Sequence, residues 1–224
     1  LSSEGKTPMF LAVDGEVDAE YQVRFDNLDT GENVYTTTIR PGQWSAPSPK
    51  YYVRWRVTVD EVAVLNPSGS TAHTQQVLDY TLDLMGKSVW VGLTSKSLGD
   101  TLAWVPYALE FQKAHGCEVI VETWWRSILE SAYPEIKFCA ANTFRGEAYA
   151  GYKVGCWDND YSRNPVNWRV IPLQQVATDA LGLEYREIQP KVQCGDGPRP
   201  IPEKYVCVSE FSTLQAKHWN HQQG

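Results

Sequence analysis

The residues best suited to chemistry in this 224-residue chain stand where a buried strand gives way to a helix. The apolar run Ser88–Leu93 predicts the strand, and small polar residues at 94–97 lead to Gly99 and Asp100, which open an apolar-periodic stretch reaching His115. In α/β folds, ligands bind beyond the carboxyl ends of strands, where helix N-termini present unpaired N–H groups. Asp100 can therefore face a substrate, and the alternative is that it only caps the helix.

A second strand-to-loop edge occurs near the end of the chain. The apolar run Lys204–Val208 predicts a buried strand, and Ser212, Thr213 and Lys217 follow it. Small hydroxyl residues leave backbone N–H groups accessible, and a lysine one turn later can neutralise phosphate, so this pattern predicts a phosphate-facing loop. The alternative is an ordinary hydroxyl turn with a solvated lysine. The chain contains neither GxGxxG nor GxxxxGK[ST], which argues against a nicotinamide enzyme or a P-loop NTPase.

The elements that must position these residues change in kind near residue 80. Before that point, alternating apolar and polar residues predict half-buried antiparallel strands at Tyr21–Phe25, Asn33–Ile39 and Tyr51–Val59. The turn residues Asp29–Glu32 predict a hairpin between the first two strands. We therefore expect residues 1–80 to form a small antiparallel β domain, either a sandwich or a barrel.

Residues 81–224 alternate strands with helices, which predicts a Rossmann-like α/β domain with a parallel sheet and right-handed crossovers. The further elements expected are strands at Glu118–Val121, Ile136–Cys139 and Tyr185–Ile188 and helices at Trp124–Leu129 and Pro172–Leu181. Pro106 lies inside the first predicted helix, so that helix should either bend there or begin after Asp100. A late start would weaken the argument for Asp100 at a helix N-terminus.

Composition limits the classes of partner. The apolar content of 42% is enough to fill a core, while the net charge of -7 and the pI near 5.1 argue against broad binding to nucleic acid or anionic membranes. The five cysteines include no CxxC and no Cys/His spacing suited to zinc, so we expect no metal site. No run approaches the roughly 20 apolar residues of a membrane span, and the chain opens without a signal segment. We expect a cytoplasmic protein with reduced thiols and no membrane insertion.

Six segments, in a fairly specific order and spacing, carry a resemblance to a known family. They are Ser97–Tyr107, His115–Val121, Pro172–Gln174, Leu181–Tyr185, Lys204–Val208 and Ser212–Asn220. Together they resemble the bacterial autotransporter heptosyltransferases, GT-B glycosyltransferases related to the lipopolysaccharide heptosyltransferases. The resemblance covers about residues 80–224, and the β-rich start agrees with the small β domain that such enzymes carry before the GT-B core.

The resemblance implies an inverting transfer of heptose from an ADP-activated donor to serine hydroxyls of an autotransporter adhesin, without a divalent metal at the reacting centre. Asp100, with Gly99 beside it, matches the catalytic aspartate of the family's Gly-Asp motif. Lys217 matches the phosphate-contacting lysine, with Ser212 and Thr213 helping to hold the diphosphate. A hydroxyl must lose its proton as it attacks the anomeric carbon, which suits a carboxylate base.

The resemblance also implies features that these residues do not display. GT-B enzymes place most nucleotide contacts on a C-terminal Rossmann domain that is missing here, so we expect a piece of a longer enzyme that is inactive alone. Family members bind iron through cysteines, and no cysteine cluster in this chain matches that site. Homo-oligomers are known in the family, but the chain reveals no interface.

Two rival functions stay open at this point. One is a lipopolysaccharide-type heptosyltransferase, and the other is a non-catalytic carbohydrate- or protein-binding module in which the β-rich region recognises the adhesin. Trp157 and Trp168 could stack on a sugar, although most tryptophans are packing residues. The fold alone does not choose between these functions.

Overall fold

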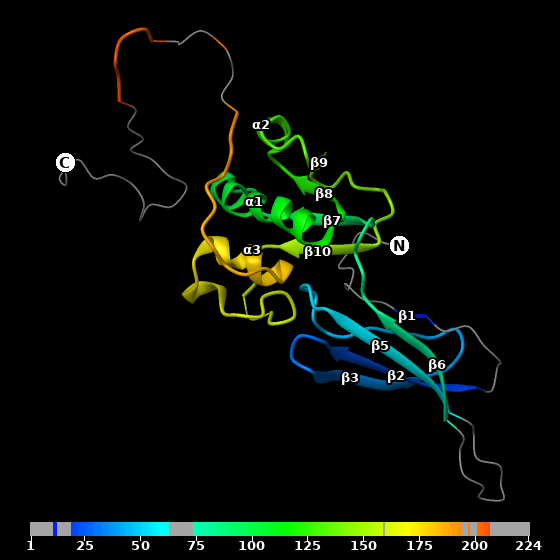
Figure 1. Cartoon of the computed structure of the whole chain (residues 1–224). Helices are drawn as coiled ribbons and strands as arrows, with labels where there is room; N and C mark the ends of the chain where they lie inside the picture. Colours follow the sequence, from blue (N-terminus) through cyan, green and yellow to red (C-terminus); the bar gives the residue numbers. More distant parts are fainter. Residues whose placement is uncertain are drawn as a thin grey trace, which may run out of the picture. The chain divides into compact units, whose positions relative to one another are not determined.

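The computed structural model describes residues 11–12, 19–62, 74–158, 160–193, 197 and 201–206. The chain divides into two compact units, Leu1–Gln193 and Cys194–Gly224. The helices and strands described below all lie in the first unit, which contains an antiparallel and a parallel sheet (Figure 1).

The antiparallel strands form an open four-stranded sheet in the order β3-β2-β5-β6. Its strands are β2 (Glu20–Asn27), β3 (Glu32–Ile39), β5 (Trp55–Val62) and β6 (Thr74–Thr81). A separate two-stranded ribbon pairs β1 (Leu11–Ala12) with β4 (Trp44–Ser45). We expected a sandwich or a barrel, whereas this four-stranded sheet does not close on itself.

The hairpin predicted between β2 and β3 is confirmed, and Gly31 in its turn has a φ of 72°, a left-handed conformation that glycine adopts without steric cost. Alternate residues of β2 and β5 are buried, and four of them, Val23, Phe25, Trp55 and Val57, are at most 1% exposed. The period-2 pattern of these strands thus places one face of the sheet in the core.

The second sheet is parallel throughout and has the strand order β10-β7-β8-β9. Its strands are β7 (Ser88–Leu93), β8 (Glu118–Thr123), β9 (Lys137–Ala140) and β10 (Ala150–Val154). Counted along the chain, the order is 3-2-1-4, which is the order of a Rossmann fold. The α/β class predicted from the sequence is confirmed. Because the order reverses between the first and fourth strands, the topological switch point lies between β7 and β10.

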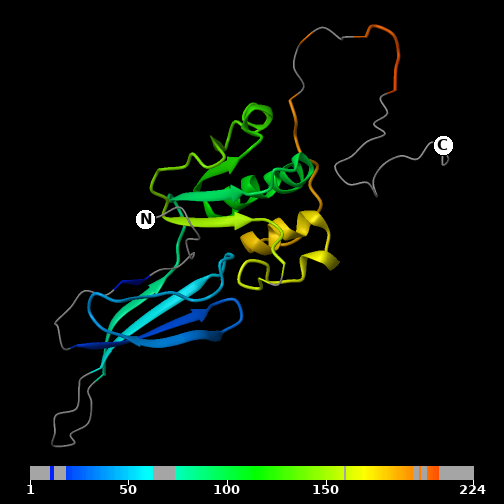
Figure 2. The ribbon, with the colours of Figure 1, turned by 180° about the vertical axis from the view of Figure 1, so that it is seen from behind.

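Helices α1 (Leu98–His115) and α3 (Leu173–Leu181) pack against each other beside this sheet, and α2 (Arg126–Leu129) is a single short turn (Figures 1 and 2). A 3-10 turn, η1 (Trp168–Val170), precedes α3. Helix α1 begins before Asp100 and continues through the buried Pro106, so a start after Asp100 is wrong. Pro106 lacks the N–H that would bond to the carbonyl four residues earlier, and burial of the surrounding helical face offsets that loss.

The predicted strand at 185–188 does not form, and a second predicted strand is irregular in the part that the structure describes. Residues 185–188 are irregular, and side chains satisfy their backbone instead: the Tyr107 hydroxyl donates to the Arg186 carbonyl at 2.7 Å, and Gln174 Nε2 donates to the Ile188 carbonyl at 3.1 Å. The described part of the predicted strand Lys204–Val208, residues 204–206, is irregular and exposed.

Candidate functional site

The site is built on the carboxyl ends of two neighbouring strands. β10 pairs with β7 in parallel, with Val154 opposite Leu93, so the loops that leave both strands start side by side. Thr94 joins the two loops, because its N–H and its hydroxyl both donate to the Val154 carbonyl, at 3.4 and 3.2 Å. This edge is the switch point, where ligands bind in open α/β sheets.

Gly155 lets the two loops approach closely. A Cβ at this position would stand 2.8 Å from Thr94 Oγ1 and 2.8 Å from the Trp157 ring, closer than carbon atoms normally pack. Sequence reasoning did not single out Gly155, because the contact is with a residue 61 positions earlier in the chain. The glycine thus fixes the spacing of the two loops at the switch point.

Asp100 lies in the first turn of α1 and is half-buried. The N-cap is Ser97, whose hydroxyl accepts from the Asp100 N–H at 3.4 Å, so the alternative that Asp100 caps the helix is wrong. The Asp100 carboxylate instead accepts a hydrogen bond from the Ser95 hydroxyl, with 2.6 Å between Ser95 Oγ and Asp100 Oδ2. The helix N-terminus stabilises a negative charge at this position.

The loop after β10 is within electrostatic reach of Asp100. Burial first, and then the negative charges of Asp100 and Asp158, raise the pKa of the Cys156 thiol. Cys156 follows Gly155 directly, so the carboxylate from the β7 loop and the start of the β10 loop share one environment. This shared environment is the candidate active site.

The sequence predicted five site residues, of which the structure describes two. It places Gly99 beside Asp100 at the start of α1, and Gly99 is exposed; a Cβ there would meet only Ser97 Oγ, at 3.8 Å. The space around Gly99 is therefore open. Ser212, Thr213 and Lys217 lie outside the described residues.

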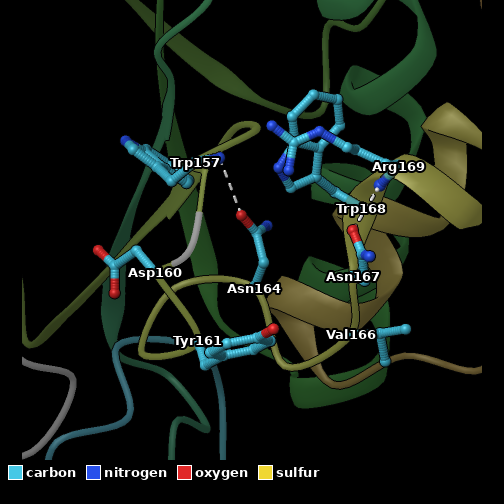
Figure 3. Close-up of a pocket in the computed structure, with 8 residues that line it drawn as sticks. All are labelled: Trp157, Asp160, Tyr161, Asn164, Val166, Asn167, Trp168 and Arg169. Atoms are coloured by element: carbon cyan, nitrogen blue, oxygen red, sulfur yellow. Dashed lines mark hydrogen bonds between the residues drawn. The ribbon is translucent and has the colours of Figure 1, made fainter.

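An aromatic pocket lies farther along the β10 loop (Figure 3). The buried Asn164 holds the loop, because its Oδ1 accepts from the Trp157 N–H and its Nδ2 donates to the Gly155 carbonyl, both at 3.0 Å. The residues that line the pocket are Trp157, Asp160, Tyr161, Asn164, Val166, Asn167, Trp168 and Arg169.

Guanidinium groups occupy the faces of the two tryptophans in this pocket. Arg163 stands 5.0 Å from the Trp157 ring centre, and Arg169 stands 4.9 Å from the Trp168 ring centre. Cation–π contacts of this kind are packing interactions within the protein. A sugar stacked on either ring would therefore need a face that the arginine does not cover.

The described residues do not fit a metal centre. Within them, no three His, Cys, Asp or Glu side chains gather closely enough to hold an ion. Burial raises the pKa of both Cys117 and Cys139 to about 11, which disfavours the thiolate that binds iron. Cys194 and Cys207 lie outside the described residues.

Among the helices that the structure describes, none combines the length and the apolar character needed to cross a bilayer.

Comparison with known proteins places these features in context. No family model matches the chain. It is 31% identical over 206 residues to the autotransporter heptosyltransferase Aah of Escherichia coli and 32% identical over 211 residues to TibC of an enterotoxigenic E. coli strain. It is also 25% identical over 212 residues to BimC of Burkholderia thailandensis, which is described as an inactive autotransporter heptosyltransferase.

The solved structures that match include TibC, described as a dodecameric iron-containing glycosyltransferase, with a TM-score of 0.76 over 90% of this chain and 51% of that one. A second TibC structure, in complex with ADP-D-β-D-heptose, gives a TM-score of 0.77. The alignments cover 90–92% of this chain and about half the length of the curated relatives it matches. The resemblance carried by the motifs is therefore confirmed, and the chain is a relative of the autotransporter heptosyltransferases.

Proposed function

We propose that the product of the intact gene encoding this chain transfers heptose from ADP-heptose to serine hydroxyls of an autotransporter adhesin. The activity named for the relatives and the ADP-heptose complex of TibC support the donor and the transfer. The observation that carries the proposal for this chain is the position of Asp100, whose carboxylate stands at the switch point and does not cap α1. We expect these 224 residues alone to be inactive, because they span about half of each relative.

The proposed reaction is a displacement with inversion at the anomeric carbon. The serine oxygen of the acceptor forms a bond to that carbon, and the bond from the carbon to the β-phosphate oxygen breaks on the opposite face, releasing ADP. Asp100 takes the serine proton as the new bond forms. A positioned general base contributes about 10²- to 10⁴-fold to a rate, and alignment of donor and acceptor supplies a further part.

The donor is held by residues near the end of the chain in this proposal. Lys217 neutralises charge that grows on the departing diphosphate, and Ser212 and Thr213 offer hydroxyl and N–H donors to it. Gly99, exposed beside Asp100, leaves the donor room to approach the start of α1. If Lys217→Ala leaves the affinity for ADP-heptose unchanged by calorimetry, this part of the proposal is wrong.

The proposal also covers the partners of the protein, the compartment in which it acts and its division into domains. The partners are the adhesin acceptor, the nucleotide-sugar donor and further copies of the same protein, the last supported by the dodecameric description of TibC. We place the reaction in the cytoplasm, in keeping with the free thiols among the described cysteines. We further propose that residues 1–80 and 81–224 act as a β-rich domain and a Rossmann-like domain.

A non-catalytic function is the main rival, because one relative, BimC, is described as inactive. In that case the β-rich region would bind adhesin or carbohydrate and the α/β part would serve as a scaffold. A lipopolysaccharide-type heptosyltransferase is the nearer rival, with lipid core sugar in place of serine as the acceptor.

One experiment separates the three functions. The intact gene product is co-expressed with a candidate autotransporter in a host that makes ADP-heptose, and both the adhesin and the lipid core are analysed by mass spectrometry. A mass increase of one heptose on adhesin serines supports the proposal, and the same increase on the lipid core supports a lipopolysaccharide-type heptosyltransferase. Binding of the adhesin without any increment, in the presence of folded protein and donor, supports the non-catalytic module.

A further inference from the structure

The start of α1 departs from the usual arrangement of a capped helix. Ser97 is the N-cap, and Asp100 stands three residues later, where a capping box places an acidic or amide side chain. In a capping box that side chain reaches back to accept from the N-cap backbone N–H. Asp100 makes no such bond, because the Ser97 N–H donates to Ser95 Oγ at 3.0 Å.

Ser95 therefore occupies the place that Asp100 would take. Its hydroxyl oxygen accepts from the Ser97 N–H, and its hydroxyl proton is donated to Asp100 Oδ2 at 2.6 Å. A hydroxyl has one proton to donate and two lone pairs to accept with, so both bonds form at once. Among the residues that the structure describes, no other hydrogen bond reaches the Asp100 carboxylate.

We propose that Ser95 is a positioning residue that holds the Asp100 carboxylate off the N-cap, at the start of α1 beside the switch point. The inference rests on the proposed function only for its catalytic consequence. The positional claim stands on the two hydrogen bonds of Ser95 and can be tested without activity.

Removing the Ser95 hydroxyl should move the Asp100 carboxylate. In Ser95→Ala, the Ser97 N–H loses its acceptor, and the nearest replacement is the Asp100 carboxylate, which can complete the capping box by rotating about its side-chain bonds. Helix α1 thus stays capped and the protein stays folded. Asp100 moves away from the reacting position, so the cost falls on the chemical step.

The positional claim is tested by crystal structures of Ser95→Ala and of the unaltered intact gene product. We expect an Asp100 carboxylate oxygen within about 3 Å of Ser97 N in the variant, a normal hydrogen-bond distance, and no such contact in the unaltered protein. Ser95→Thr, which keeps the hydroxyl, should retain the original position of Asp100. An unchanged Asp100 in Ser95→Ala overturns the proposal.

Kinetics test the catalytic consequence. Ser95→Ala should lower kcat by about 10- to 100-fold, part of the contribution of a positioned base, while the KM for ADP-heptose stays within about twofold. Ser95→Thr should restore kcat. A moved Asp100 with unchanged kcat refutes Asp100 as the base while leaving heptose transfer itself established, whereas an unmoved Asp100 refutes the role of Ser95.

Discussion

Replacing Gly155 with alanine tests whether close approach of the two loops holds the switch point together. The backbone at Gly155 is outside the left-handed region, so the effect is steric: the new Cβ would stand 2.8 Å from both Thr94 Oγ1 and the Trp157 ring. Relief requires Thr94 to rotate and lose its hydroxyl bond to Val154, worth about 1 kcal/mol, and Trp157 to shift as well. Overpacking of this kind costs about 1–3 kcal/mol, so we expect Gly155→Ala to lower the free energy of unfolding by that amount.

Urea unfolding of the chain and its variants measures this loss. Gly99→Ala is the matched control, because its Cβ meets only Ser97 Oγ at 3.8 Å and alanine is the better helix former, so we expect no loss of stability. Thr94→Ala in the Gly155→Ala background should recover about 1 kcal/mol, since one of the two clashing atoms is gone. The reasoning is refuted if Gly155→Ala is as stable as Gly99→Ala.

Three further predictions follow from other contacts in the α/β part. Glu122→Ala removes the acceptor of Trp90 Nε1 and should cost about 2 kcal/mol in urea unfolding; a loss below about 0.5 kcal/mol would contradict it. Asp100→Asn removes a negative charge that raises the pKa of the Cys156 thiol, so Cys156 should be alkylated faster at pH 8, as measured by peptide mass spectrometry. An unaltered alkylation rate would show that Asp100 has no electrostatic influence on Cys156. Burial raises the pKa of Asp179, so ionisation of this carboxyl lowers the stability of the fold as pH rises through its folded pKa. Asp179→Asn should therefore stabilise the protein at pH 7 but not at pH 3. Equal effects at the two pH values would show that Asp179 does not have a raised pKa.

The sequence predicted the elements whose signals are local. The apolar run of β7, the hairpin between β2 and β3, and the end of α3 at Leu181 each depend on neighbouring residues, and the structure confirms them. Gly182 has a φ of 64°, the left-handed conformation in which glycine commonly ends a helix.

Elements that depend on distant partners were not predictable from local pattern. β10 is a five-residue segment with a glycine in its interior, and it is a strand because β7 lies beside it. The run beginning at Lys204 has a stronger apolar pattern, yet residues 204–206 form no strand. Tertiary pairing, which a single sequence does not display, decides between such segments.

The candidate site likewise combines a residue that local sequence signals predict with residues that depend on contacts in the folded protein. Its carboxylate was identified from the order of strand, loop and helix, whereas its supports were not: Gly155 acts through Thr94, and Ser95 through the side chain of Asp100. These roles arise from side-chain contacts that follow only from the folded geometry. Spacing along the chain can thus locate a reacting group but does not reveal what orients it.

The most direct test of the central claim compares heptose transfer and donor binding in Asp100→Asn and the unaltered intact gene product. We predict that the variant binds ADP-heptose with unchanged affinity by calorimetry, while transfer to the adhesin, followed by intact-mass spectrometry, falls by about 10²- to 10⁴-fold. Transfer at the normal rate by the variant would contradict the claim that Asp100 at the switch point is the base.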